Sequence, residues 1–308
     1  MLDLRRLRTL REVAVQGSIS GAARALRFTP SAVSQQLARL EEEAGVQLLE
    51  RRPSSVKLTD AGQVLVAHTE SILARLHEAE AEMRTVARKG GGELRITSFP
   101  TAAATIVPTA LATFSSGHPE VSVTLVESEP VSGAARVKAG EFDVGLVWEY
   151  DFVPAPVGSG LTLVWLLDDP IHLLLPPGHE LAGAAEVDLR DLAGMPWITS
   201  TPRWPCSPFT RRACQVAGFE PRIVAETDDH RTLQRLVAEG VGAALETELS
   251  LRDLQVDLAV LPLTVPLKRR IFAVHRDDAG WAPRAFADIL VDVAKPRLKA
   301  VPEPAEAA

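Results

Sequence analysis

The chain has 308 residues, of which 46% are hydrophobic and 24% charged, and its net charge is -7. These values are typical of a globular protein and allow about two domains of about 150 residues each. The longest apolar runs, residues 171–177 and 238–245, are far shorter than the roughly 18 residues of a membrane helix. We therefore expect no membrane partner. Because the first residues lack the pattern of a signal peptide, we expect a cytoplasmic protein.

The charge is distributed unevenly along the chain. Residues 1–58 carry ten Lys and Arg against six Asp and Glu, whereas residues 91–308 carry 19 against 29. DNA phosphates need positive charge only where they are contacted. A small basic segment followed by a larger acidic one therefore favours a DNA-binding module attached to a separate regulatory body.

The first 58 residues predict three short helices. Leu4, Leu7, Leu10 and Ala14 recur at three- and four-residue spacing, which gives the first helix one apolar face. Gly17 ends that helix, and Ser18 caps a second helix over residues 20–26.

The third helix begins at Thr29, which is a favourable cap, and Pro30 suits the first helical position. Only Arg27 and Phe28 separate it from the second helix, as in a helix-turn-helix. Its outward side carries short polar groups and a cation, which are typical of a helix that enters the major groove. The basic segment 50–58 predicts a hairpin that would serve as a wing. The candidate DNA-binding residues are Ser18, Pro30, Ser31, Ser34, Gln35, Arg39, Arg51, Arg52 and Lys57.

Residues 59–89 predict one long helix. Apolar residues recur alternately four and three positions apart, as in a heptad seam, at Leu65, Thr69, Ile72, Leu76, Ala79, Met83 and Val86. We expect this seam to pair with the same helix of a second copy. The alternative is a single amphipathic helix that packs on its own domain. Three glycines at 90–92 then predict a hinge.

The rest of the chain alternates between strand and helix patterns, which predicts a doubly wound α/β fold. Expected strands are 94–97, 121–126, 142–147, 171–175, 197–199, 222–225 and 270–275. Expected helices are 102–114, 132–139, 207–217, 231–239 and 283–293, and residues 245–262 have no clear pattern. The tail 301–308 is expected to be disordered.

Segments 18–26, 29–41 and 45–51 together closely resemble the LysR-type transcriptional regulators. The matching runs are Ser18-Ile19-Ser20-Gly21-Ala22-Ala23, then Thr29-Pro30-Ser31-Ala32-Val33-Ser34-Gln35-Gln36-Leu37 and Gly45-Val46-Gln47-Leu48-Leu49-Glu50-Arg51. Leu49 stands where the family often has Phe, and Pro30 stands where it often has Gln. The second departure removes a side chain that could contact a base.

The resemblance implies an N-terminal all-α winged helix-turn-helix, a long linker helix, and a periplasmic-binding-protein-like effector domain of two subdomains. The implied boundaries are 1–58 for the DNA-binding domain and 59–90 for the linker helix and hinge, then 91–165 with 266–300 for the first subdomain and 166–265 for the second. The resemblance implies regulation by a small-molecule effector in the cleft between the subdomains. It also implies a homodimer or tetramer on double-stranded DNA with an interrupted dyad, and RNA polymerase is a further candidate partner.

Open α/β sheets bind ligands beyond the carboxyl ends of their strands. Several hydroxyl, acidic and aromatic residues follow the expected strands, and the candidate effector-binding residues are Ser98, Thr101, Trp148, Thr199, Ser200, Thr201, Asp228, Asp229 and His230. The alternative for each hydroxyl or acidic residue is a plain helix cap. Acidic groups beside helix N-termini could accept an amphoteric ligand such as an amino acid.

Enzyme chemistry is not indicated. The chain has no Gly-x-Ser-x-Gly, Walker or Gly-x-Gly-x-x-Gly motif, and its seven histidines do not cluster at metal-ligand spacing. We therefore expect no catalytic residue, metal or cofactor. A free-standing ligand-binding protein is the main alternative. Peroxide-sensing members of the family carry a reactive cysteine pair, but Cys206 and Cys214 would lie about 12 Å apart in one helix, so inert thiols are expected.

Overall fold

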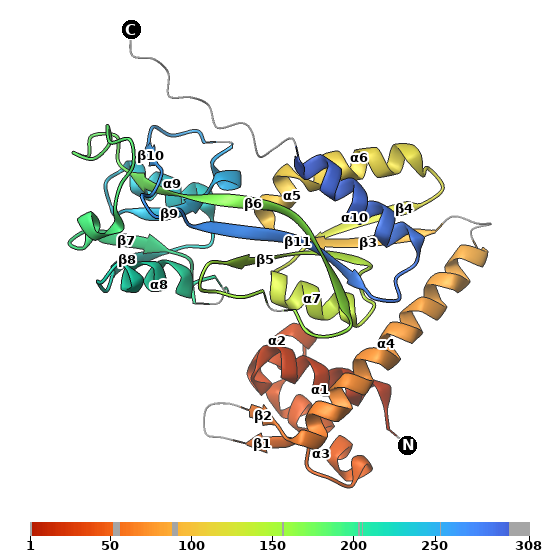
Figure 1. Cartoon of the computed structure of the whole chain (residues 1–308). Coiled ribbons are helices and arrows are strands. Elements are labelled where there is room, and N and C mark those ends of the chain that lie inside the picture. Colours follow the sequence, from red (N-terminus) through yellow and green to blue (C-terminus); the bar gives the residue numbers. More distant parts are fainter. Residues whose placement is uncertain are drawn as a thin grey trace. The chain divides into compact units, whose positions relative to one another are not determined.

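The computed structural model describes residues 2–51, 56–87, 92–155, 157–202, 204, 206–252 and 254–295 (Figure 1). The predicted wing residue Arg52, the first two glycines of the expected hinge and the tail 301–308 lie outside this range. The chain divides into two compact units, residues 1–93 with 135–142 and residues 94–134 with 143–308. No helix in the described ranges is long and apolar enough to span a membrane.

The first unit begins with the three predicted helices. They are α1 (Leu4–Gln16), α2 (Ile19–Leu26) and α3 (Pro30–Ala44), followed by the antiparallel strands β1 (Leu49–Arg51) and β2 (Val56–Leu58) and by α4 (Asp60–Ala87). Leu10, Val33 and Leu40 are fully buried where the helices meet. Gly17 and Gly45 end α1 and α3 in the left-handed conformation, which glycine adopts without steric cost. The predicted helix-turn-helix is therefore confirmed.

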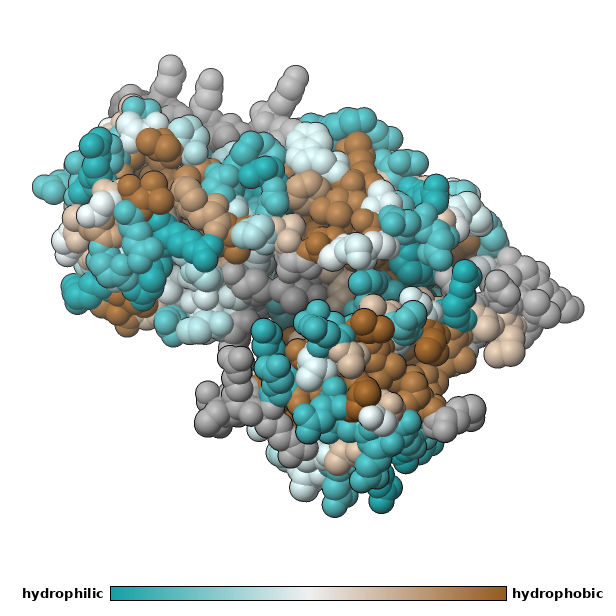
Figure 2. Space-filling view, turned by 60° about the horizontal axis from the view of Figure 1, so that its bottom comes forward, coloured by the Kyte–Doolittle hydropathy of each residue, from teal (hydrophilic) through white to brown (hydrophobic). Residues whose placement is uncertain are grey.

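Helix α4 presents much of the predicted seam to solvent. Ile72, Leu76 and Met83 are 47%, 36% and 66% exposed, whereas Thr69 is buried and hydrogen bonds to the carbonyl of Leu65. The side chain of Val86 lies outside the described part of the structure. Apolar side chains gather on the lobe formed by α1 to α4 in Figure 2. Exposed apolar residues at heptad spacing are typical of a helix that pairs with another helix.

The rest of the chain is an α/β fold. Its first elements are β3 (Glu93–Ser98), α5 (Pro100–Thr105), α6 (Val107–Gly117), β4 (Ser122–Glu127), α7 (Pro130–Lys138), β5 (Val144–Tyr150) and β6 (Leu161–Leu175). They are followed by η1 (Leu189–Leu192), β7 (Pro196–Thr199), α8 (Pro208–Val216), β8 (Arg222–Glu226), α9 (His230–Ala238), β9 (Ala244–Thr247), η2 (Glu248–Leu251), β10 (Ala259–Leu261), β11 (Lys268–Arg276) and α10 (Trp281–Ala294).

Strand β6 connects two parts of this fold. Its residues 161–170 pair with β11, and its residues 171–174 pair with β9, both antiparallel. The main sheet has the order β10-β6-β11-β5-β3-β4, and β7 and β8 form a separate parallel pair (Figure 1). Since β3 and β5 are parallel while β5 and β11 are antiparallel, the sheet is mixed rather than wholly parallel as the alternation predicted.

Two hydrophobic cores lie along β6. One contains Phe99, Phe114 and Phe286, and the other contains Leu173 and Trp197. Each core is built from side chains of its own helices and strands, so this part of the chain consists of two packed bodies joined by continuous strands.

Three local predictions were wrong. The single helix expected over 102–114 is two helices that meet at Ile106, because Pro108 in the first turn of α6 has no N–H to donate backward. Strand β6 begins ten residues before the predicted 171, since Asp168, Asp169 and Pro170 resembled a strand boundary. Trp148 lies within β5 and does not follow it.

Candidate functional site

The helix-turn-helix is fixed by two side-chain caps. Ser18 Oγ accepts a hydrogen bond from the Gly21 N–H at 3.0 Å, and Thr29 Oγ1 accepts one from the Ala32 N–H at 3.2 Å. Between the two helices Arg27 has a φ of 56°. Each cap satisfies a backbone donor that the first turn of a helix leaves without a partner. These local contacts set the direction in which α3 leaves the turn.

Helix α3 has one buried and one exposed face. Leu37 is buried, whereas Ser31, Gln35 and Arg39 are exposed and recur every four residues, so they share a face. Pro30 is exposed beside them, and Ser34 is half-buried. The exposed face combines hydrogen-bonding groups near the helix N-terminus with a cation farther along, as a major-groove reading helix requires.

The β1–β2 pair occupies the position of the predicted wing. Glu50 pairs with Lys57 across the two strands, and the Lys57 side chain is exposed. The backbone of Arg51 belongs to β1, whereas its side chain and the whole of Arg52 lie outside the described part of the structure. Ser18 has a structural role as a cap, which leaves its predicted contact with DNA untested.

The effector part of the chain contains a cavity of about 80 Å³ between the ends of β3, β5, β7, β9 and β11. One wall is aromatic and is made by Phe99, Trp148, Tyr150, Trp204 and Phe209. Tyr150 contacts both Trp148 and Phe209, with ring centroids 5.0 and 4.8 Å apart. Such a wall favours a ligand with an apolar or planar portion.

A buried ion pair lies at this cavity. The Arg269 Nε and Nη2 atoms donate to Asp169 Oδ2 at 3.0 and 2.5 Å, and Nη2 also donates to Thr101 Oγ1 at 3.0 Å. The side chains of Arg269 and Asp169 are 3% and 1% exposed. The guanidinium lies 5.1 Å from the ring centroid of Phe99. The charge of Arg269 is therefore compensated, and its orientation is fixed.

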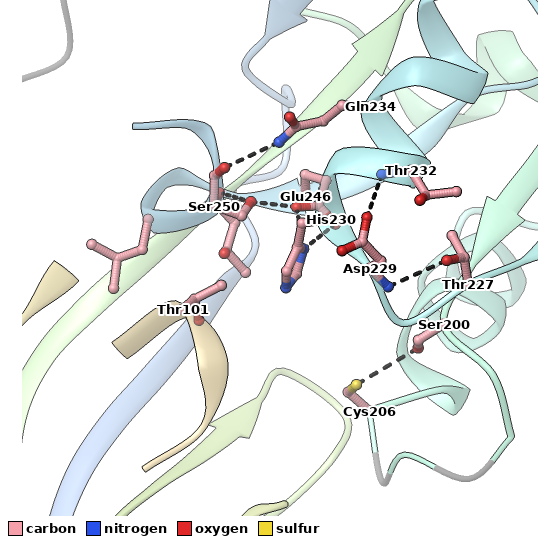
Figure 3. Close-up of polar contacts among 12 residues, drawn as sticks. Thr101, Ser200, Cys206, Thr227, Asp229, His230, Thr232, Gln234, Glu246 and Ser250 are labelled. Atoms are coloured by element: carbon pink, nitrogen blue, oxygen red, sulfur yellow. Dashed lines mark hydrogen bonds and ion pairs between the residues drawn. The ribbon is translucent and has the colours of Figure 1, made fainter. Parts of the chain in front are cut away.

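The opposite wall holds a second charged pair. Glu246 accepts hydrogen bonds from His230 Nδ1 at 2.8 and 3.1 Å and from the Ser250 hydroxyl (Figure 3). The negative charge of Glu246 raises the pKa of His230 above its ordinary value, and burial acts in the opposite direction. The protonated ring is thus favoured, and an imidazolium–carboxylate pair lines the cavity.

The structure brings six of the nine predicted effector residues to this cavity, namely Thr101, Trp148, Thr199, Ser200, Asp228 and His230. The other three have local contacts. Ser98 is buried and donates to the carbonyl of Phe99, Thr201 donates to Asp228 through both N and Oγ1, and Asp229 caps α9 by accepting from the Thr232 N–H. For Asp229 the plain helix-cap alternative therefore describes the observed contact.

Sequence reasoning missed several residues that line the cavity, including Tyr150, Phe209, Glu246, Thr247 and Arg269. Glu246 and Thr247 fall in the segment that showed no clear periodicity. Arg269 is a cation inside a strand that is otherwise apolar from residue 271, and this was a usable signal, because a strand buried on both faces carries a charge only where it has a partner.

The two cysteines lie in different places. Cys206 precedes α8, packs beside the first core and lines the cavity, whereas Cys214 is inside α8 in the second core. Burial raises the pKa of both thiols, in Cys214 to about 12. The thiolate is the reactive form, so these environments disfavour reaction with an oxidant. No group of three metal-binding side chains occurs among the described residues.

The fold and these two sites define a regulator that joins a DNA-reading helix-turn-helix to a ligand-binding α/β body. Two family models match the chain. The "bacterial regulatory helix-turn-helix protein, lysR family" model matches residues 4–63, and the "LysR substrate binding domain" model matches residues 87–295. The chain therefore belongs to the LysR family of transcriptional regulators, and it binds DNA through the helix-turn-helix and a small-molecule effector through the C-terminal domain.

Individual relatives agree with this assignment. The probable HTH-type transcriptional regulator LrrA of Synechococcus elongatus is 29% identical, with 97% of this chain and 99% of the relative covered. The transcriptional dual regulator GltC of Bacillus subtilis is 28% identical, with 92% and 94% covered. These proteins are regulators and not enzymes. The match over residues 4–63 also removes the alternative of a free-standing ligand-binding protein.

Solved structures share the fold over nearly the whole chain. A mutant of OxyR from Corynebacterium glutamicum has a TM-score of 0.59 and 25% identity, with 96% of this chain and 92% of that chain covered. Full-length BenM has a TM-score of 0.60 and 21% identity, with 98% and 100% covered. The predicted fold class is confirmed by these matches.

Proposed function

We propose that this protein recognises an interrupted dyad in double-stranded DNA by inserting α3 of each protomer into the major groove. The observation that carries this proposal is the exposed face of α3, on which Ser31, Gln35 and Arg39 stand in line above a buried apolar face. Ser31 and Gln35 can hydrogen bond to base edges, and Arg39 can contact phosphate. Pro30 and Ser34 contribute the margin of this surface, and Arg51, Arg52 and Lys57 supply the wing.

The proposed homodimer forms through α4. Its exposed seam residues Ile72, Leu76 and Met83 would be covered by the same residues of a second protomer. A two-fold dimer predicts half-sites separated by one or more helical turns of about 34 Å each. Membership of the family supports a further association into a tetramer and contact with RNA polymerase. A regulator of this kind acts where chromosomal DNA lies, so we propose a cytoplasmic location.

The effector is proposed to occupy the cavity between the two cores. Its walls come from both sides of β6, so a bound ligand would change how the two bodies are held. We place the division of the effector domain along the predicted boundaries, with the chain crossing near residue 165 and returning near residue 265. The change of β6 from pairing with β11 to pairing with β9 supports this division.

The test is to select bound fragments from a genomic DNA pool with the full-length protein and to repeat the selection with Gln35→Ala. The parent protein is expected to recover a dyad, and the variant is expected to lose preference at one base position in each half-site. Gln63→Ala, which changes an exposed glutamine of α4, is the matched control and should recover the parent motif. An unchanged motif with Gln35→Ala would refute the assigned role of α3.

A further inference from the structure

The cavity between the two cores contains polar atoms that the protein itself does not satisfy. Thr247 is 3% exposed, and its Oγ1 atom is buried with no hydrogen-bond partner. It lines the cavity together with His230, whose Nδ1 atom is held by Glu246. Among the described residues, none bonds to His230 Nε2. A buried hydroxyl without a partner costs free energy unless a ligand satisfies it.

The hydrogen-bonding roles of these atoms follow from their fixed partners. Ionised Glu246 is 6% exposed and can only accept hydrogen bonds, so the Nδ1 atom of His230 must carry a proton. In the imidazolium form Nε2 also carries a proton and donates. In Figure 3 the ring of His230 extends from the start of α9 into the space between Thr101 and Cys206.

Thr101 provides a further donor at the same cavity. Its Oγ1 atom accepts a hydrogen bond from Arg269 Nη2, so the proton of the Thr101 hydroxyl remains available to a ligand. His230, Thr101 and Thr247 belong to three different elements, α9, α5 and β9. Their convergence offers donors from three directions to one acceptor group.

The acidic residues near this cavity are already engaged. Asp228 accepts two hydrogen bonds from Thr201, Asp169 accepts those of Arg269, and Asp229 caps α9. The groups that remain are donors rather than acceptors, so the ammonium group of an amino acid has no dedicated partner among them. A cavity of about 80 Å³ also limits the ligand to a few heavy atoms or one ring, since a cavity of about 150 Å³ can hold benzene.

We propose that the effector is a small carboxylic acid whose carboxylate binds His230 Nε2, Thr101 Oγ1 and Thr247 Oγ1, with its apolar part against Trp148, Tyr150 and Phe209. Glu246 is a positioning residue, because it orients the imidazole and keeps it protonated. This assignment rests on the proposed function of the cavity as the effector site.

The experiment is isothermal titration calorimetry on the full-length protein with matched sets of small compounds. The acids are benzoate and butyrate, the neutral counterparts are benzamide and butyramide, and the cation is benzylamine. At least one acid is expected to bind, with its amide and the amine at least tenfold weaker, since a charge-assisted hydrogen bond is stronger than a neutral one.

Three variants locate the carboxylate. His230→Ala is expected to lower acid affinity at least tenfold, and Thr247→Val about fivefold, because each removes one donor. Acid affinity of the parent should fall as the pH rises through the pKa of His230. In Glu246→Gln this fall should occur at lower pH, which a merely structural role of Glu246 would not produce. His179→Ala, outside the cavity, is the matched control and should bind like the parent.

Folding and the proposed function are checked separately. Each variant must retain the thermal midpoint of the ligand-free protein within a few degrees and the binding of the selected DNA fragment. Preferential binding of the amides or the amine that competes with Thr101→Val-sensitive binding would overturn the carboxylate assignment while leaving the cavity as the effector site. Failure of both acids to bind would also overturn it, and DNA binding would still stand. Acid binding that is unaffected by His230→Ala would place the carboxylate elsewhere.

Discussion

The buried pair Asp169–Arg269 supports the sharpest stability prediction. Asp169 accepts two hydrogen bonds from Arg269 and one from the Leu249 N–H at 3.0 Å, and both charged side chains are almost inaccessible. Asp169→Ala leaves a buried guanidinium and a backbone N–H without their acceptor. Removing one partner of a buried ion pair costs about 3–5 kcal/mol. In a body of about 200 residues this lowers the thermal midpoint by about 6–20 °C.

Tryptophan fluorescence measures this unfolding selectively. All five tryptophans lie between residues 148 and 281, so the signal reports the effector domain and not the helix-turn-helix. The double variant Asp169→Leu/Arg269→Met replaces both charges by apolar groups and should recover most of the loss, because no unpaired charge remains. Asp188→Ala removes an exposed pair with Arg190 and should leave the midpoint unchanged.

Two results would refute this reasoning. A midpoint of Asp169→Ala within about 2 °C of the parent would mean that the guanidinium is hydrated or otherwise satisfied, because the predicted loss is several times larger. A double variant less stable than the single variant would mean that the site depends on its shape rather than on charge compensation.

Other regions of the molecule give further predictions. Arg39→Ala should weaken binding to all DNA sites and reduce the salt dependence of the affinity by one phosphate contact; filter binding at several salt concentrations would disprove this if the slope stayed constant. Gly62→Ala should destabilise the helix-turn-helix unit by about 1–3 kcal/mol, since an added Cβ would lie 2.2 Å from the Leu48 carbonyl oxygen, and an unchanged circular dichroism melt would contradict that contact. The raised pKa of His230 means that its pairing with Glu246 stabilises the domain fully below about pH 6.5 and loses this contribution as the pH rises through the folded-state pKa; equal pH profiles of urea unfolding for the parent and Glu246→Gln would argue against the pair.

The N-terminal part of the fold could be predicted closely because its signals are local. Ser18 and Thr29 cap the helices that their positions predict, and the apolar spacing of α3 gives Leu37 its buried place. A cap or a helical face depends on residues within four positions, so sequence patterns capture it.

The cavity could be predicted only in part because it depends on distant pairings. Thr101 and His230 follow or begin elements in the manner expected of an α/β sheet, and the rule for strand ends found them. Glu246 and Arg269 reach the cavity through the register of β9 and β11 against β6. Nothing within a few residues of either position indicates that register, so only the fold reveals their role.

The measurement that tests the account most directly is a footprint of the full-length protein on a genomic fragment recovered by selection, with and without Ile72→Asp/Met83→Asp in α4. The parent protein should protect two half-sites separated by one or more helical turns and related by a dyad. The α4 variant should remain folded but protect a single half-site at much weaker affinity. Protection without a dyad, or an unchanged footprint with the α4 variant, would contradict recognition by paired α3 helices of a dimer.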